Sequence, residues 1–366
     1  MDSQHDQARD FFFAGVRDYE GGRFDSAERN FDASLALAPG RVSTLTNLGA
    51  ARLKLGRCED AAVVLEEALR KEPDNVNALG HRAAALAELG SPQEALATLE
   101  RVVALDPKRS AAWTLRGTLL RELGDPAGAV AAYVQAIANG ADRELLEFYI
   151  AGIEGANASD APKAPPRLYV QSLFDGYAQG FEAHLVEVLK YRAPQVLAGG
   201  LAKVGRHFDC ALDMGCGTGL CGVLLRPMAV RLEGVDLSPN MVRQSKERGV
   251  YDAVFEADIV EFLSGVQARY DLVIAADVFI YVGALEAAFA RVASAIRPRG
   301  VFCFSVEKEA EEELVLRGSL RYAHSAAYIE RLAAIGGFEI VTVEEHTVRE
   351  DQRVAIPGLF YWLVKR

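Results

Sequence analysis

Apolar and small residues recur along residues 8–143 with a period of 34 positions. Such a period predicts stacked helix pairs, because each pair buries its apolar face only against its neighbours. Small residues suit the crossing points of the helices, glycines the turns between them and prolines the ends of second helices. The columns are Phe11, Leu45, Leu79 and Trp113; Gly15, Gly49, Ala83 and Gly117; Gly22, Gly56, Gly90 and Gly124; Ala27, Ala61, Ala95 and Ala129; Phe31, Leu65, Leu99 and Tyr133; and Pro39, Pro73 and Pro107.

These columns resemble the tetratricopeptide repeat. The resemblance implies an all-α superhelix over residues 8–156, made of four repeats and a capping helix at Glu144–Ile153. Its concave face is expected to take a protein or a peptide. Repeats that only form a homodimer or shield the active site are the alternative. The expected lining is Phe12, Val16, Tyr19, Thr46, Ala50, Lys54, Ala84, Glu88, Thr118 and Arg121.

Residues 157–166, with the sequence NASDAPKAPP, separate two kinds of pattern. The stretch is polar and rich in Ala and Pro, which is typical of an extended spacer. We therefore predict a linker here and a second domain over residues 167–366.

Short apolar runs alternate with helical stretches in this second domain. The alternation predicts an α/β fold with a parallel sheet covered by helices on both faces. Helices are expected at 240–248, 285–296 and 324–335. Strands are expected at 208–213, 231–236, 252–256, 271–276, 301–306, 338–345 and 358–364.

A glycine-rich turn follows the first of these strands. The run LDMGCGTG has three glycines at alternate positions after Asp213, which lets a ligand approach the main chain. Asp236 comes roughly 20 residues later, where a ribose-binding carboxylate belongs. Two further apolar runs, AVFEADI and YDLVIAADV, also end in acids. A nucleoside-containing ligand is therefore expected at the carboxyl ends of these strands.

The motifs LDMGCGTG, GVDLSPNMV, EADI and YDLVIAADVFIYVG resemble those of the class I S-adenosylmethionine-dependent methyltransferases. The resemblance implies a Rossmann-like seven-stranded sheet in the order 3214576, with the last strand antiparallel. The segment FDGYAQGFEAHL is also similar to one that opens the methyltransferase domain in a bacterial group with N-terminal tetratricopeptide repeats. The cofactor-binding residues so implied are Asp213, Gly215, Cys216, Gly217, Gly219, Asp236, Leu237, Met241, Asp258, Ile259, Tyr169 and Tyr177. For each aspartate, a helix N-cap is the alternative role.

Residues after the fourth strand face the methyl acceptor in this family. Here they read ADVFIYVG, without the Asn/Asp-Pro-Pro-Tyr/Phe signature of enzymes that methylate amide or base nitrogens. Asp277 and Tyr281 are candidate catalytic residues, as polar groups expected close to the methyl group. His324, within RYAHS, is the candidate base because imidazole titrates near neutral pH. The alternative is that His324 caps the helix that follows.

Charge and cysteine content narrow the partners. The net charge is −11, so a nucleic-acid partner is not expected. No apolar run approaches the roughly 20 residues of a membrane helix. The five cysteines lack metal-ligand spacing, and the N-terminus lacks the pattern of a signal peptide. We therefore expect a cytoplasmic protein with reduced structural thiols and no bound metal.

The sequence thus predicts an S-adenosylmethionine-dependent methyltransferase, O- or N-directed, whose repeats recruit or present a protein or peptide acceptor. A small-molecule methyltransferase of secondary metabolism is the first alternative. A scaffold that binds the cofactor without turnover is the second.

Overall fold

The structure is a computed structural model that describes residues 2–155, 161–177, 189–204, 206–351 and 354–366. It divides into two compact units, Met1–Ile150 and Ala151–Arg366. The domain boundaries predicted from the sequence stay predictions.

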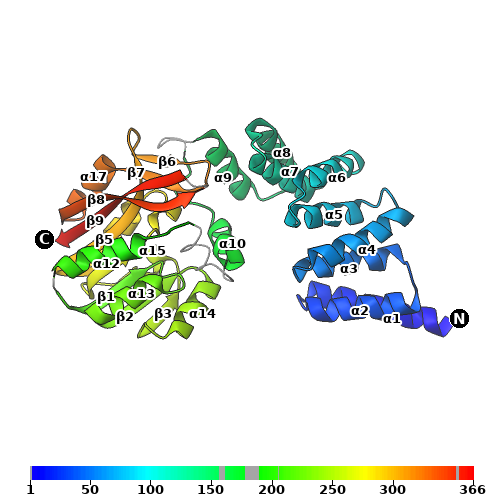
Figure 1. Cartoon of the computed structure of the whole chain (residues 1–366), viewed down its shortest axis with the longest axis horizontal. Coiled ribbons are helices and arrows are strands. Elements are labelled where there is room, and N and C mark those ends of the chain that lie inside the picture. Colours follow the sequence, from blue (N-terminus) through cyan, green and yellow to red (C-terminus); the bar gives the residue numbers. More distant parts are fainter. Residues whose placement is uncertain (1, 156–160, 178–188, 205, 352–353) are drawn as a thin grey trace. The chain divides into compact units, whose positions relative to one another are not determined.

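The first unit is a stack of antiparallel helix pairs, as the 34-residue period predicted (Figure 1). Phe31 and Tyr133 show why the small column is needed: a Cβ on Gly15 would come within 2.6 Å of the Phe31 ring, and one on Gly117 within 2.6 Å of Tyr133. The turn glycines have φ of +71° to +78°, a conformation that other residues rarely adopt. The helices are α1 (Asp2–Glu20), α2 (Phe24–Leu37), α3 (Val42–Lys54), α4 (Cys58–Lys71), α5 (Val76–Glu88), α6 (Pro92–Leu105), α7 (Ser110–Glu122), α8 (Pro126–Ala138) and α9 (Arg143–Glu154).

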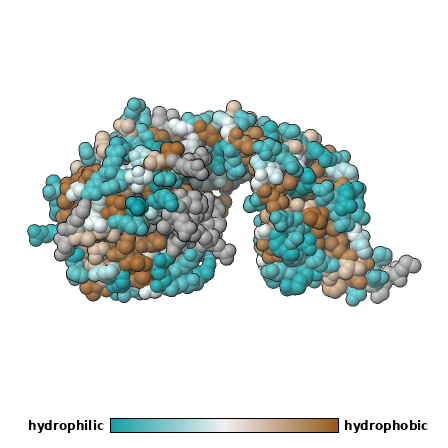
Figure 2. Space-filling model, in the orientation of Figure 1, coloured by the Kyte–Doolittle hydropathy of each residue, from teal (hydrophilic) through white to brown (hydrophobic). Residues whose placement is uncertain are grey.

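The residues expected to line the concave face differ in exposure. Lys54 and Glu88 are exposed, whereas Thr46 and Ala50 are buried. The Thr46 hydroxyl donates to the Val42 carbonyl at 2.9 Å, within its own helix. Apolar and polar residues are mixed over the face of the repeats seen in Figure 2. Thr46 and Ala50 therefore serve packing, whereas Lys54 and Glu88 are open to solvent.

The second unit is built on one mixed sheet, in which the described residues form nine strands. Strands β1 to β5 run in the order β3-β2-β1-β4-β5 and are parallel, and β9 pairs antiparallel with both β5 and β8. This is the predicted order with its reversed last strand. The strands are β1 (Phe208–Met214), β2 (Ala229–Asp236), β3 (Ala253–Glu256), β4 (Tyr270–Ala275), β5 (Ile296–Glu309), β6 (Leu314–Leu316), β7 (Tyr322–Ser325), β8 (Phe338–Asp351) and β9 (Val354–Lys365).

Helices cover both faces of this sheet, each over its own apolar core. One core includes residues of α16 and α17, and the other includes residues of α12 and α13. Five phenylalanines, Phe279, Phe289, Phe302, Phe304 and Phe338, make ring contacts in the first core. The helices are α10 (Arg167–Tyr177), α12 (Ala193–Val204), α13 (Leu220–Leu225), α14 (Pro239–Arg248), α15 (Ile259–Phe262), α16 (Glu286–Ala295) and α17 (Ala326–Ile335), with 3-10 turns η2 (Arg226–Met228) and η3 (Phe279–Tyr281).

Two features differ from the expectation. A short hairpin, β6 and β7, follows β5, and β7 extends the sheet beside the end of that strand. Within the predicted linker, Pro162 and Lys163 pack on the second unit: Tyr322 donates to the Pro162 carbonyl at 2.7 Å, and the Ala284 amide donates to the Lys163 carbonyl at 2.8 Å. Main-chain carbonyls make both contacts, so a Pro- and Ala-rich composition does not prevent them.

Among the described residues, none of the helices combines the length and the apolar character that a bilayer span requires.

Candidate active site

The site is a cavity of about 1020 Å³ at the carboxyl ends of β1, β2 and β4. Strands β4 and β2 lie on opposite sides of β1, so the direction of winding reverses here and leaves a crevice. The glycine loop, Asp236, Asp258 and Asp277 all line this one cavity.

The glycine loop and Asp236 form one hydrogen-bonded unit. Asp236 Oδ2 accepts the Gly217 amide at 2.8 Å, and Oδ1 accepts the Ser238 amide at 2.9 Å. Gly217 has φ of +52°, and a Cβ there would meet no atom within 4 Å, so its main chain is open to a ligand. Each carboxylate oxygen can accept a second hydrogen bond, for instance from a ribose hydroxyl.

Asp213 lies at the end of β1 and is almost fully buried. The Tyr251 hydroxyl donates to its Oδ2 at 2.7 Å. The pKa of Asp213 is raised to about 7, because burial and the negative charge of Asp236 raise it by more than the hydrogen bond from Tyr251 lowers it. The group can therefore hold either a proton or a negative charge near neutral pH.

Another part of the cavity wall is apolar. Leu237, Met241 and Ile259 line it, and Met241 is buried. Asp258 caps α15, since its Oδ1 accepts the amides of Val260 at 2.8 Å and Glu261 at 3.0 Å. The N-cap alternative thus holds for Asp258, although the residue also lines the cavity.

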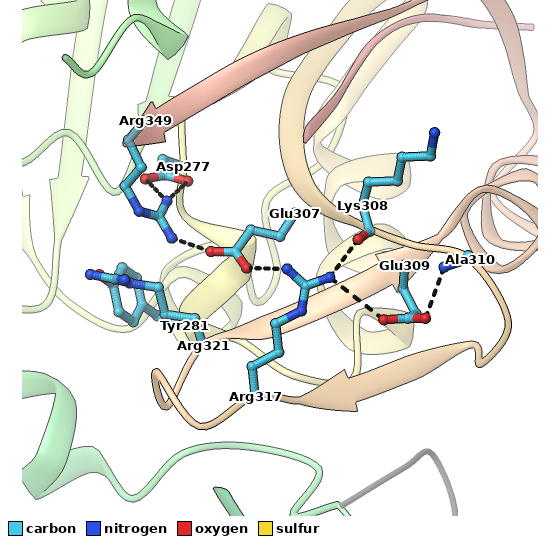
Figure 3. Close-up of polar contacts among 9 residues, drawn as sticks. All are labelled: Asp277, Tyr281, Glu307, Lys308, Glu309, Ala310, Arg317, Arg321 and Arg349. Atoms are coloured by element: carbon cyan, nitrogen blue, oxygen red, sulfur yellow. Dashed lines mark hydrogen bonds and ion pairs between the residues drawn. The ribbon is translucent and has the colours of Figure 1, made fainter. Parts of the chain in front are cut away.

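A chain of alternating charges supports the other half of the cavity (Figure 3). Arg349 donates to Asp277 through Nη1, at 3.1 Å to Oδ1 and 2.9 Å to Oδ2, and through Nη2 to Glu307. Glu307 in turn accepts from Arg317 at 3.0 Å. The backbone of Asp277 has φ of +59°, and its amide donates to Ser305 Oγ at 2.9 Å. Asp277, which follows β4, is therefore fixed at the cavity wall by Ser305 of β5 and Arg349 of β8.

Tyr281 and Arg321 lie side by side in the same wall (Figure 3). Arg321 Nε donates to the Tyr281 hydroxyl oxygen at 3.3 Å, which leaves the hydroxyl proton of Tyr281 for an acceptor. Phe174 of α10 packs edge-on against the Tyr281 ring, with centroids 5.1 Å apart. This half of the cavity combines aromatic surface with a few oriented polar groups.

The segment before α10 closes one side of this half. Lys163, Ala164 and Pro165 line the cavity. The Ala284 amide holds the segment by donating to the Lys163 carbonyl, and Gly283 allows this close approach, because a Cβ there would lie 2.4 Å from that oxygen. We call Pro162–Pro165 the strap.

Three of the predicted site residues that the structure describes are not among those that line the cavity. His324 is fully buried, and its Nε2 lies 2.7 Å from the Gly283 carbonyl, so the neutral ring must carry its proton on Nε2. Burial lowers the pKa of His324 to about 4. The ring therefore supports the Gly283 loop and is not retained as a base. Gly219 is the N-cap residue of α13, and Tyr169 is buried outside the cavity wall. The side chain of Tyr177 lies outside the described residues.

Sequence reasoning missed Arg349, Glu307, Tyr251 and the strap. Glu307 and Arg349 could have been noticed in the sequence, because each is a charged residue inside or next to an apolar strand. Tyr251 and the strap offered no such signal, since their contacts depend on the folded arrangement.

The donor set fits S-adenosylmethionine. Asp236 presents two carboxylate oxygens for a ribose, the Leu237, Met241 and Ile259 side chains form an apolar slot for a purine, and buried Asp213 suits an ammonium group. The remaining volume, walled by Asp277, Tyr281 and the strap, is left for an acceptor.

Comparison with known proteins finds a match in each half of the sequence. Residues 211–300 match the family model of a methyltransferase domain, and residues 52–119 match that of the tetratricopeptide repeat. Methyltransferase-like protein 27 of Homo sapiens is 35% identical over 82 residues, which are 21% of this chain and 33% of that protein. The match thus spans about a third of the length of the curated relative.

Solved structures with a similar arrangement exist for each part. Magnesium protoporphyrin IX methyltransferase from Synechocystis PCC 6803, solved with bound SAH, is 16% identical with a TM-score of 0.44, and the match covers 55% of this chain and 100% of that one. MamA from Desulfovibrio magneticus RS-1 is 21% identical with a TM-score of 0.38, and the match covers 41% of this chain and 84% of that one.

The strand order and the two family matches confirm the predicted class I methyltransferase domain and the tetratricopeptide repeats. S-adenosylmethionine is the cofactor of this class, and the cavity has the groups to hold it.

Proposed function

We propose that this chain, which joins tetratricopeptide repeats to a class I methyltransferase domain, is an S-adenosylmethionine-dependent methyltransferase. The observation that carries the proposal is the single cavity into which the glycine loop, Asp236 and Asp277 all open. One end of that cavity fits the cofactor, and the other end remains for the nucleophile. The acceptor is an oxygen or a nitrogen of a protein or peptide that the repeats recruit or present.

The contacts of the residues that line the cavity support the following proposed roles. Asp236 binds the ribose, Asp213 the amino group, and Leu237, Met241 and Ile259 the adenine. When bound, the cofactor supplies a methyl group activated by its sulfonium. The chain's task is then to place the acceptor atom in line with that methyl group and to exclude water, which can account for most of the rate acceleration.

Asp277 is the group best placed to orient an acceptor. Arg349 fixes its carboxylate with two hydrogen bonds, so Asp277 can accept a hydrogen bond from an acceptor O–H or N–H and orient a lone pair of that atom toward the cofactor. The Tyr281 hydroxyl can donate to a second polar atom of the acceptor. Both residues touch the acceptor space and are proposed as catalytic.

A small-molecule methyltransferase is the second candidate. The strap, Phe174 and Tyr191 wall the acceptor half, which favours a compact acceptor or one long side chain over an extended peptide. The repeats would then serve assembly.

Cofactor binding is tested by titration calorimetry of the full chain with S-adenosylmethionine and S-adenosylhomocysteine. Asp236→Ala removes two charge-assisted hydrogen bonds and should weaken binding by about 10- to 100-fold. Absence of binding by the wild-type chain would refute the proposal.

The acceptor class is tested by incubating a cell lysate with methyl-labelled cofactor and the full chain. Label in a protein band supports the first candidate, and label in the small-molecule fraction supports the second. If the chain binds the cofactor but neither fraction is labelled, the chain is a scaffold that does not transfer the methyl group. Charge reversal at the exposed positions Lys54 and Glu88 should reduce labelling of a protein acceptor and leave that of a small molecule unchanged.

A further inference from the structure

Three glycines around the cofactor loop face one tyrosine ring. A Cβ on Gly222 of α13 would lie 2.4 Å from both the Cζ and the hydroxyl oxygen of Tyr251. A Cβ on Gly219 would lie 3.1 Å from the same ring, and one on Gly234 of β2 would lie 3.3 Å from it. These glycines, including Gly219 of the loop motif, thus make room for Tyr251.

The space that these glycines leave allows Tyr251 to reach Asp213. Tyr251 comes from the loop between α14 and β3, and through this gap its hydroxyl reaches Asp213 Oδ2 at 2.7 Å. Tyr251 itself is not among the residues that line the cavity, whereas Asp213 is. The tyrosine therefore contacts the carboxylate from behind, on the side away from the ligand space.

We propose that Tyr251 is a positioning residue for cofactor binding: its hydroxyl holds the Asp213 carboxylate, ionised and oriented, to receive the amino group of the cofactor. This inference rests on the proposed function, which assigns the amino group to Asp213. A phenol hydroxyl donates to a carboxylate more strongly than to a neutral acid, so the contact favours the charged form.

The surroundings of Asp213 otherwise oppose ionisation. Burial is the largest effect on its pKa, and the charge of Asp236 acts in the same direction. Among the described residues, no arginine, lysine or histidine contributes to the pKa of Asp213. The titratable groups that face Asp213 are Asp236 from β2, Tyr251, Cys216 and Cys221 from the glycine loop and α13, Cys303 from β5 and Tyr191 from the segment before α12. Tyr251 is the one whose hydrogen bond lowers the pKa.

The test is the pH profile of S-adenosylhomocysteine binding to the full chain. Tyr251→Phe removes the hydroxyl and keeps the ring, so Asp213 should need a higher pH to ionise. The dissociation constant of the variant, divided by that of the wild type, should be about 10 at pH 6 and should approach 1 at pH 9. The amino group of the ligand titrates identically with both proteins and cancels in this ratio.

Proton release gives a second readout. Calorimetry in two buffers of different ionisation enthalpy measures the protons released per ligand bound. At pH 7.5, Tyr251→Phe should release about half a proton more than the wild type. A purely structural role would lower affinity by the same factor at every pH and leave proton release unchanged.

Two controls match the change. Tyr270 donates to the buried Glu233 at 2.8 Å in the same sheet and lines no part of the cavity, so Tyr270→Phe should give a ratio that does not vary with pH. Gly222→Ala forces the Tyr251 hydroxyl away without altering Tyr251 itself and should reproduce the profile of Tyr251→Phe. Gly199 is a helical glycine beside which a Cβ meets nothing within 4 Å, and Gly199→Ala is its control.

A ratio that stays flat from pH 6 to pH 9 in both Tyr251→Phe and Gly222→Ala overturns the inference, provided that the wild type binds. If the wild type does not bind S-adenosylhomocysteine, the proposed function itself fails.

Discussion

Replacing Arg349 by methionine tests the charge chain at the acceptor half of the cavity. The side chain is about 2% exposed and holds two acids, Asp277 and Glu307. With Arg317, these residues form a neutral group of four charges. Arg349→Met removes the hydrogen bonds to both acids and leaves a net charge of −1, which is largely buried.

The expected cost is about 3–5 kcal/mol of unfolding free energy, because an uncompensated buried charge remains. Adding Asp277→Asn makes the cluster neutral again while the Glu307 to Arg317 pair persists, so the double variant should be about 2 kcal/mol more stable than Arg349→Met alone. Arg317→Met, at a guanidinium that is 31% exposed, should cost only about 1 kcal/mol.

Urea unfolding followed by tryptophan fluorescence measures these differences for the second unit alone. The chain has two tryptophans, Trp113 in the repeats and Trp362 in β9. In a Trp113→Phe background, the buried Trp362 reports on the sheet that carries Arg349. A loss below about 1 kcal/mol for Arg349→Met, or a double variant no more stable than the single one, contradicts the assignment of a buried, mutually dependent charge cluster.

Gly283→Ala should push the strap away, since its Cβ would lie 2.4 Å from the Lys163 carbonyl oxygen, and hydrogen exchange of the Ala284 amide should accelerate. Gly265→Ala is the control, because Gly265 has the same left-handed backbone but an added Cβ would meet no atom within 4 Å. This variant should leave the exchange rate of the Ala284 amide unchanged. Equal rates in the two variants would contradict the packing of the strap against Gly283. His324 has a folded pKa of about 4 against about 6.5 when unfolded, so its contribution is complete above pH 6.5 and is lost as the pH falls toward 4, by up to about 3 kcal/mol. His324→Gln should therefore flatten the dependence of stability on pH between 4 and 6.5, whereas His346→Gln, at an exposed position, should not.

The repeats and the sheet were accessible from the sequence because local patterns determine them. Each turn glycine and each glycine at a helix crossing is required by contacts within one helix pair. Its recurrence every 34 residues could therefore be interpreted without knowledge of the rest of the fold. The seven predicted strands are apolar runs of ordinary length. The hairpin of β6 and β7 was not predicted, since Leu314–Leu316 has only three residues and Tyr322–Ser325 only four. Runs that short have no measurable period.

The acceptor half was predicted less well because its contacts join distant positions. Asp277 and Arg349 are 72 residues apart, and His324 bonds a carbonyl 41 residues away. His324 looked like a base because imidazole titrates near neutral pH, but the sequence does not show whether the ring reaches a cavity. Its full burial removes that possibility and turns the residue into a support for the Gly283 loop.

A charged residue within an apolar strand nevertheless carries a usable signal. A lone buried charge is costly, so such a residue requires a partner elsewhere in the fold. Glu233 in β2 and Glu307 in β5 are both almost completely buried, and each pairs with two arginines, Arg231 and Arg269 in one case and Arg317 and Arg349 in the other. The cluster at Glu307 differs because it also holds a carboxylate on the cavity wall. The same requirement for charge pairing that stabilises the sheet thus extends, through Arg349, to the residue that we propose orients the methyl acceptor.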